Sequence, residues 1–130
     1  MDKVKFMENY NIYTKDILKS KTTFKSIDEI MDHLKQKTEE HMAGEFIAVF
    51  DHYKHTKSLP NGEIAEDILD AKNFIFCFGV MIPNPNAVAL RPRAIGVTEF
   101  ADKFVLNFME APMENANKSM IQFIESVENK

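Results

Sequence analysis

The stretch from Asn73 to Phe100, NFIFCFGVMIPNPNAVALRPRAIGVTEF, constrains the fold more than any other part of the chain. It holds the longest apolar run in the sequence, which is far shorter than the ~20 apolar residues that a membrane-spanning helix needs. Apolar residues rich in Phe and Ile that end at a Pro/Asn cluster are typical of a buried β-strand. We therefore expect a strand at 73–82, a break at 83–86, and the rest of the chain arranged around this strand.

The composition describes a globular chain and excludes several classes of protein. The chain has 130 residues, of which 45% are hydrophobic and 28% charged, so we expect a single domain, residues 1–130, with a core at about 10–128. The net charge of −4 gives no general attraction for nucleic acid, and no segment is suited to a membrane. The N-terminus has no apolar signal-peptide core, and Cys77 has no second cysteine to pair with. Together these features predict a cytoplasmic protein.

Hydrophobic periodicity and capping signals predict the elements. A strand is expected at 10–18, and a helix begins at the capping box Ser26-Ile27-Asp28-Glu29. Further strands are expected at 46–50 and 73–82, then a hairpin of 94–100 and 104–109, and a last amphipathic helix that Pro112 opens. Residues 56–72 are expected to be irregular, with at most a short helix. The order strand, helix, four strands, helix predicts an α+β fold in which an antiparallel sheet carries two helices on one face.

The apolar residues of the expected strands lie on both of their faces. Phe74, Phe76 and Phe78 alternate with Ile75 and Cys77, and the strand at 46–50 places Phe46 and Phe50 opposite Ile47 and Val49. A sheet covered on one side only would carry polar residues on its other side. We therefore predict that a second copy of the chain covers that side, which makes the protein a homodimer.

Three short motifs resemble a known family. They are Phe50-Asp51-His52 at a strand end, Phe76-Cys77-Phe78-Gly79 in the following strand, and Leu90-Arg91-Pro92-Arg93-Ala94-Ile95 before the hairpin. Together they resemble the small prokaryotic family catalogued as domain of unknown function three hundred and two. The resemblance implies a TATA-box-binding-protein-like fold, a homodimer and no established activity. It matches Asp51, His52 and Arg93 to that family's acidic, histidine and arginine positions.

The candidate ligand site consists of Asp51, His52, Arg91 and Arg93. If the segment around Pro92 is extended, the two arginines point to the same side and form a clamp for a carboxylate or phosphate. The alternative is that each arginine pairs with a carboxylate at the surface or at an interface. The four glycines are scattered and form no phosphate-binding loop.

Two further sites are weaker candidates. His52 and His55 carry the residue types that bind zinc, but side chains three apart on a strand or loop point to opposite faces, so we expect no metal. Cys77 lies in the apolar Phe76-Cys77-Phe78 and is expected to be a buried packing residue rather than a thiolate nucleophile. His33 and His41 are expected at the surface without a role. No cofactor is expected.

Three functions remain open from the sequence. The first is a homodimeric domain that binds a small anionic ligand between the sheet and its loops, bordered by His52, Arg91 and Arg93. The second is an enzyme that uses His52 as acid or base, with Asp51 or Arg93 as its partner, or Cys77 as a thiolate. The third is a structural dimer whose exposed sheet edge pairs with another protein.

Overall fold

The computed structural model describes residues 1–129 and has an α+β architecture. Over these residues the chain forms a six-stranded antiparallel sheet in the order β1-β2-β6-β5-β4-β3, together with four α-helices. The strands are β1 (Asp2–Phe6), β2 (Tyr10–Leu18), β3 (Gly44–Phe50), β4 (Asp70–Phe78), β5 (Arg93–Glu99) and β6 (Lys103–Met109). The helices are α1 (Ile27–Glu40), α2 (His52–Ser58), α3 (Pro85–Ala89) and α4 (Glu114–Glu125), and a 3₁₀ turn spans Lys19–Lys21.

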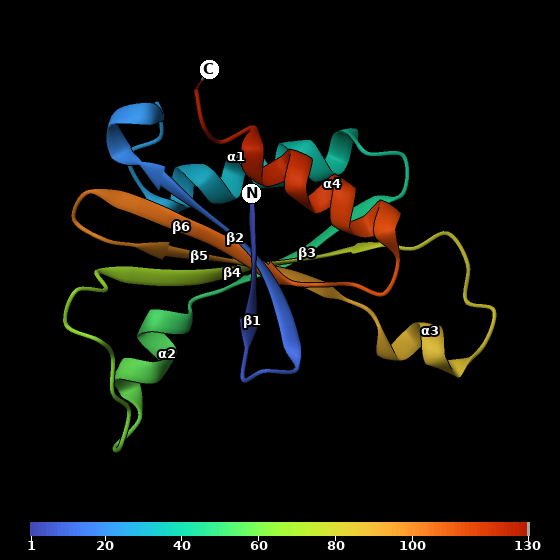
Figure 1. Cartoon of the computed structure of the whole chain (residues 1–130), viewed down its shortest axis with the longest axis horizontal. Helices are drawn as coiled ribbons and strands as arrows, with labels where there is room; N and C mark the ends of the chain where they lie inside the picture. The colour runs from blue at the N-terminus through green and yellow to red at the C-terminus, as the bar shows by residue number, and fades with distance from the viewer. Residues whose placement is uncertain (130) are drawn as a thin grey trace.

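The two long helices, α1 and α4, cover one face of the sheet, as the sequence predicts (Figure 1). We call this the helix face and the opposite side the second face. The expected stripe of α1 is confirmed, since Ile27, Ile30, Met31 and Leu34 are all buried. In α4, Met120, Phe123 and Ile124 are buried, whereas Met113 is exposed. The buried residues of both helices pack on the strand residues Phe74, Phe76, Ile95, Phe104 and Leu106 to form the core.

The start of α1 follows the predicted capping box with one difference. The Ser26 hydroxyl accepts from the Glu29 N–H at 3.2 Å, as expected. The Glu29 carboxylate accepts from the N–H of Lys25 at 3.3 Å, one residue before the position that a capping box uses. The helix ends at Glu40, with His41 as its C-cap.

The structure contains one strand and two helices that the sequence reading did not expect. Strand β1 pairs with β2 at the edge of the sheet. Helix α2 begins before the segment 56–72, which is expected to be irregular with at most a short helix, because the Asp51 carboxylate caps it by accepting from the Lys54 N–H at 2.9 Å. Helix α3 forms inside the expected break, where Asn84 caps the helix and Pro85 takes its first position. Both α2 and α3 lie on the second face (Figure 1).

A β-bulge changes the expected facing of β3. The register shifts between Phe46 and Ala48, so Phe46 pairs with Phe76, whereas Phe50 pairs with Asn73. Since Phe76 and Asn73 lie on opposite faces of β4, Phe46 and Phe50 also lie on opposite faces. The prediction that these two residues share a face is therefore wrong, because the extra residue at 47 reverses the alternation.

The second face is more polar than the sequence reading predicted. Asn73 pairs across the sheet with Gly96, Gly96 with Asn107, and Asn107 with Thr14. These four residues are partly buried and form a polar row across the middle of that face. Two-sided apolarity is a property of β3 and β4, which place Phe50, Ile75 and Cys77 on the second face, and the polar row limits it on the strands beyond them.

No helix within residues 1–129 has the length and apolar character to cross a bilayer. The proposed likeness to the TATA-box-binding protein stays a prediction.

Candidate functional site

Asp51 and His52 lie at the start of α2, and their side chains make different contacts. The Asp51 carboxylate caps the helix and lies 3.9 Å from the Lys72 ammonium, which is itself paired with Asp28 at 2.6 Å. The His52 ring approaches β4, where its Nδ1 lies 2.9 Å from Asn73 Oδ1. The hydrogen-bonding partner of His52 is therefore Asn73, and neither Asp51 nor Arg93 takes that place.

His52 and His55 share a face of α2 instead of pointing in opposite directions. Both rings pack against Phe50, with centroid distances of 5.3 and 5.4 Å. The expectation of opposite faces is wrong because this segment is helical, and residues three apart on a helix are neighbours. Over residues 1–129 no group of three or more His, Cys, Asp or Glu side chains has an arrangement that could hold a metal ion.

Arg91 extends over Gly79 at the end of β4. Its Nη1 donates to the Met81 carbonyl oxygen at 2.8 Å, and a Cβ at position 79 would lie only 2.6 Å from that nitrogen. The Nε of Arg91 is buried without a hydrogen-bond partner. Within the described part of the chain, this guanidinium pairs with no carboxylate.

Arg93 is held separately, at the beginning of β5. Its Nη2 donates to the Met109 carbonyl oxygen of β6, and its backbone pairs with Phe76. Burial lowers the pKa of Arg93, because removing the guanidinium from water disfavours its charged form. Among residues 1–129 this arginine also pairs with no carboxylate. Its Nε, like that of Arg91, is buried without a hydrogen-bond partner. The two arginines thus bind different carbonyl groups, on Met81 and Met109.

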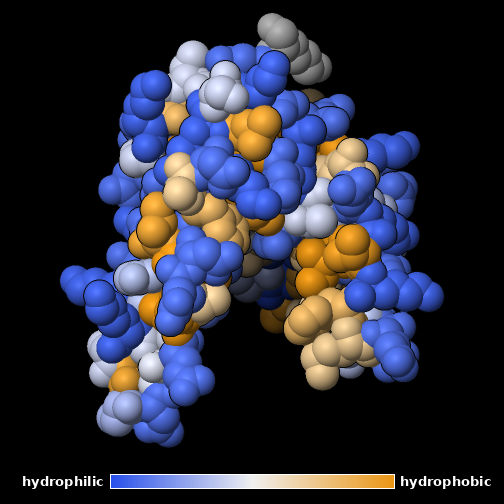
Figure 2. Space-filling view, turned by 60° about the vertical axis from the view of Figure 1, so that its left-hand side comes forward, coloured by the Kyte–Doolittle hydropathy of each residue, from blue (hydrophilic) through white to orange (hydrophobic). Residues whose placement is uncertain are grey.

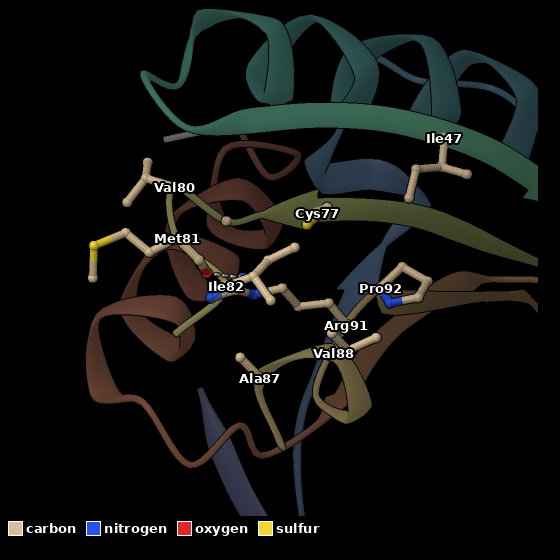
Figure 3. Close-up of a pocket in the computed structure, with 10 residues that line it drawn as sticks. Ile47, Cys77, Val80, Met81, Ile82, Ala87, Val88, Arg91 and Pro92 are labelled. Carbon is tan, nitrogen blue, oxygen red and sulfur yellow. Dashed lines mark hydrogen bonds between the residues drawn. The ribbon is translucent and has the colours of Figure 1, made fainter. Parts of the chain in front are cut away.

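An apolar cavity of about 620 Å³ lies on the second face next to Arg91 (Figure 3). Ile47 and Cys77 point into it from β3 and β4, while Val88, Arg91 and Pro92 line its other side. Val80, Met81 and Ile82 form its outer rim and are 81%, 66% and 73% exposed. We call this the arginine cavity.

A second cavity of about 670 Å³ shares Val80, Met81, Ala87 and Arg91 with the first. It is also lined by Phe78, Met113, Ser119 and His41, which belong to the side of the sheet that α1 and α4 cover. Arg91 therefore borders two adjoining cavities, whereas His52 lines a third one with Tyr53 and Glu63. Arg93 lines none of these three, so the structure does not gather the predicted site residues around one cavity.

Cys77 differs from the buried packing residue that the sequence predicted. It is only partly buried, because its side chain is on the second face and lines the arginine cavity. No histidine is among the residues that line this cavity. The cavity therefore offers no imidazole to stabilise a Cys77 thiolate.

His33 and His41 connect the two long helices, a role that the sequence reading missed. His33 Nε2 lies 2.8 Å from Ser126 Oγ, and His41 Nε2 lies 3.2 Å from Ser119 Oγ. Burial lowers the pKa of His33, and the nearby Lys37 charge lowers it further. Only the pairing of α1 with α4 reveals these contacts, since the partners are 93 and 78 residues apart in sequence.

No curated protein and no solved structure gave a significant match. The family match covers residues 1–129 and concerns a different family from domain of unknown function three hundred and two, so the resemblance drawn from the three short motifs is wrong. Those motifs are each only a few residues long, and the match over nearly the whole chain overrides them. The chain belongs to the family described as Family of unknown function (DUF6858).

Proposed function

We propose that this protein binds a small amphipathic anion, with an apolar body in the arginine cavity and a carboxylate against Arg91. The observation that carries the proposal is a guanidinium without a carboxylate partner, within residues 1–129, at the border of an apolar cavity. It supports the small anionic ligand expected from the sequence and assigns the charge recognition to Arg91.

The size and lining of the cavity support such a ligand. Cavities that bind small molecules typically have volumes of roughly 300–1,000 Å³ and mainly apolar walls with few polar groups. The arginine cavity, at about 620 Å³, has Ile47, Val88 and Pro92 in its walls and Arg91 as its charged side chain. An aliphatic chain of medium length fits this description better than a sugar or a nucleotide, which would need many more polar partners.

The state of Arg91 supports an anionic head group. One of its N–H groups donates to Met81, and within residues 1–129 the rest of the guanidinium pairs with no carboxylate. Arginine stays protonated at any physiological pH, and a partly desolvated cation gains from a bidentate carboxylate.

The test uses octanoate and octanamide, which have the same length and differ in charge. Isothermal titration calorimetry is expected to show binding of octanoate at least about tenfold tighter than octanamide, since a charge-assisted hydrogen bond contributes ~1.5–3 kcal/mol. The Arg91→Gln variant is expected to lose this preference. Arg93→Gln is the matched control and is expected to keep it, because Arg93 lines neither cavity. Equal affinities of the wild-type protein for the two compounds would refute the proposal.

Cys77 offers an independent readout in the native protein. Its thiol lines the arginine cavity and is the only thiol in the sequence. Bound octanoate is expected to slow its reaction with a disulfide reagent such as 5,5′-dithiobis(2-nitrobenzoate), because the ligand would occupy the approach. An unchanged rate at saturating octanoate would place the ligand elsewhere.

We also propose that the protein is a homodimer in which a second copy covers the apolar parts of the second face. Figure 2 shows a hollow on this side of the molecule between two projections, with apolar side chains on both walls. Ile47, Phe50 and Met109 of the sheet are 49%, 39% and 52% exposed. Light scattering at micromolar concentration is expected to give twice the mass of the chain, and Met109→Glu to shift it toward the monomer. A monomeric mass for the wild-type protein would contradict this arrangement.

A cytoplasmic location is our proposal as well. It rests on the unpaired Cys77, whose partly exposed thiol would persist best in a reducing compartment. Fractionation of cells that produce the native protein would test it.

A further inference from the structure

The imidazole of His52, in α2, is held by the side chain of Asn73 on the second face of β4. His52 Nδ1 lies 2.9 Å from Asn73 Oδ1. A carboxamide oxygen only accepts hydrogen bonds, so the proton of the neutral imidazole must be on Nδ1. Nε2 is then left with its lone pair and acts as an acceptor.

Asn107 lies in the same row of the second face, beyond Gly96 of β5. A Cβ at Gly96 would lie 2.9 Å from Asn107 Oδ1 and 3.9 Å from Asn73 Nδ2, so both carboxamides lie near the glycine. The contact that selects one tautomer of His52 is the one with Asn73 Oδ1.

The cavity that His52 lines has polar and apolar walls, and Tyr53, Thr56 and Thr98 contribute hydroxyl groups to it, which both donate and accept. It has a volume of about 290 Å³ and is separate from the arginine cavity. Besides His52, it is lined by the carboxylate side chain of Glu63, which forms no ion pair within residues 1–129. Its apolar wall consists of Ile64, Ala65, Ile68 and Ala71.

We propose that this cavity is a second binding site, in which His52 Nε2 and the Glu63 carboxylate receive the N–H groups of a small primary ammonium with a short apolar chain. Two acceptors, one of them charged, require a ligand that donates and is cationic. The volume of the cavity and its apolar wall limit the length of the ligand's alkyl chain. Asn73 acts as a positioning residue, because its carboxamide oxygen fixes the proton on Nδ1 and leaves Nε2 as the acceptor.

The first test measures the tautomer of His52. Long-range ¹H–¹⁵N NMR at pH 8 is expected to show the proton of His52 on Nδ1, which is the less populated tautomer of a free imidazole. His55 is the internal control, since it packs on the same Phe50 and has no such carboxamide. Asn73→Ala is expected to return His52 to the tautomer mixture of His55. A proton on Nε2 in the wild-type protein would overturn the proposal.

The second test measures ligand preference with three probes of similar size. At pH 8 an alkylamine is protonated and imidazole is mostly neutral. n-Butylammonium is expected to perturb the His52 signals saturably, while tetramethylammonium, which has no N–H, and 1-butanol, which has no charge, are expected to bind more weakly. Glu63→Gln is expected to weaken n-butylammonium binding about three- to tenfold, a modest factor because Glu63 is exposed.

Each outcome has a defined meaning. Equal binding of n-butylammonium and tetramethylammonium would show attraction by charge alone and would overturn the donor–acceptor proposal. Equal perturbation of His52 and His55 would show that no site exists. Neither result would affect the octanoate test, because that site is formed by Arg91 and lies in a different cavity.

Discussion

The guanidinium of Arg91 occupies the space that a side chain at Gly79 would need. A Cβ at position 79 would lie 2.6 Å from Arg91 Nη1 and 2.9 Å from its Cζ. Gly79 has no positive φ, so its conformation is open to other residues and the contact with Arg91 is its main constraint.

Gly79→Ala is therefore expected to displace Arg91 without unfolding the protein. The obstructed atoms are the end of a flexible side chain, so the free energy of unfolding should change by less than about 1 kcal/mol. Octanoate affinity, measured by calorimetry, should fall as in Arg91→Gln. The control is Gly44→Ala, whose Cβ would lie 2.3 Å from the backbone oxygen of Thr38, and which is expected to destabilise the fold instead. Unchanged octanoate affinity in Gly79→Ala would count against the role of Arg91.

Asn117 is expected to be a major polar contributor to stability. This buried residue of α4 accepts from the Ala111 N–H at 2.8 Å and donates to the Ala111 carbonyl at 2.9 Å. Asn117→Ala leaves both backbone groups unpaired and should cost ~1–3 kcal/mol in urea denaturation. The exposed Asn115→Ala is the control, for which a change of less than ~0.5 kcal/mol is expected. Similar values for the two variants would argue that water satisfies Ala111.

His33 is expected to make stability depend on pH. The single hydroxyl proton of Ser126 is donated to the Phe123 carbonyl at 2.6 Å, so His33 Nε2 must donate to Ser126. Because the pKa of His33 is lowered in the folded state, the unfolded chain binds this proton more readily. The contribution of His33 to the free energy of unfolding is complete above a pH of about 6.5, the ordinary pKa of histidine. It is lost as the pH falls through the lower pKa that His33 has in the folded state.

The measurement is the urea midpoint between pH 8 and pH 5. Wild-type protein should lose more stability over this range than His33→Gln, which has no imidazole to protonate. Lys37→Gln should reduce the loss in part, because the Lys37 charge contributes to the lowered pKa of His33. Parallel curves for wild type and His33→Gln would exclude this linkage.

The β1–β2 turn is expected to tolerate glycine well. Met7 and Glu8 have φ values of 53° and 65°, a region that costs other residues ~1–2 kcal/mol relative to glycine. Glycine loses more backbone entropy on folding than other residues, which offsets part of this gain. Glu8→Gly should therefore raise stability by up to about 1 kcal/mol, measured as a higher Tm. Lys5→Gly, within strand β1, should lower the Tm. A lower Tm for Glu8→Gly would mean that the Glu8 side chain contributes contacts that outweigh the strain.

Elements with strong local signals could be predicted from the sequence. The Ser26 cap and the spacing of Ile27, Ile30 and Leu34 identified α1, because a helix face is formed by neighbours three and four residues apart. The asparagine at position 84 and the aspartate at 51 carried capping signals for α3 and α2 that were not used. The site is not predictable in the same way, since an extended segment places the two arginines on one side, whereas in the structure Arg91 donates to Met81 and Arg93 to Met109, in different parts of the chain.

By itself, the sequence determined the α+β class, the two long amphipathic helices and most of the strands, since these depend on periodicity over a few residues. The tertiary structure decided what the second face presents. The bulge at Ile47 reversed the facing of β3, and the pairing of β4, β5 and β6 brought Asn73, Gly96 and Asn107 into one row. It also placed Arg91 over Gly79, at the cavity that the partly buried Cys77 lines. These contacts are between residues of different elements, and local sequence patterns do not predict them because register and packing are properties of the whole sheet.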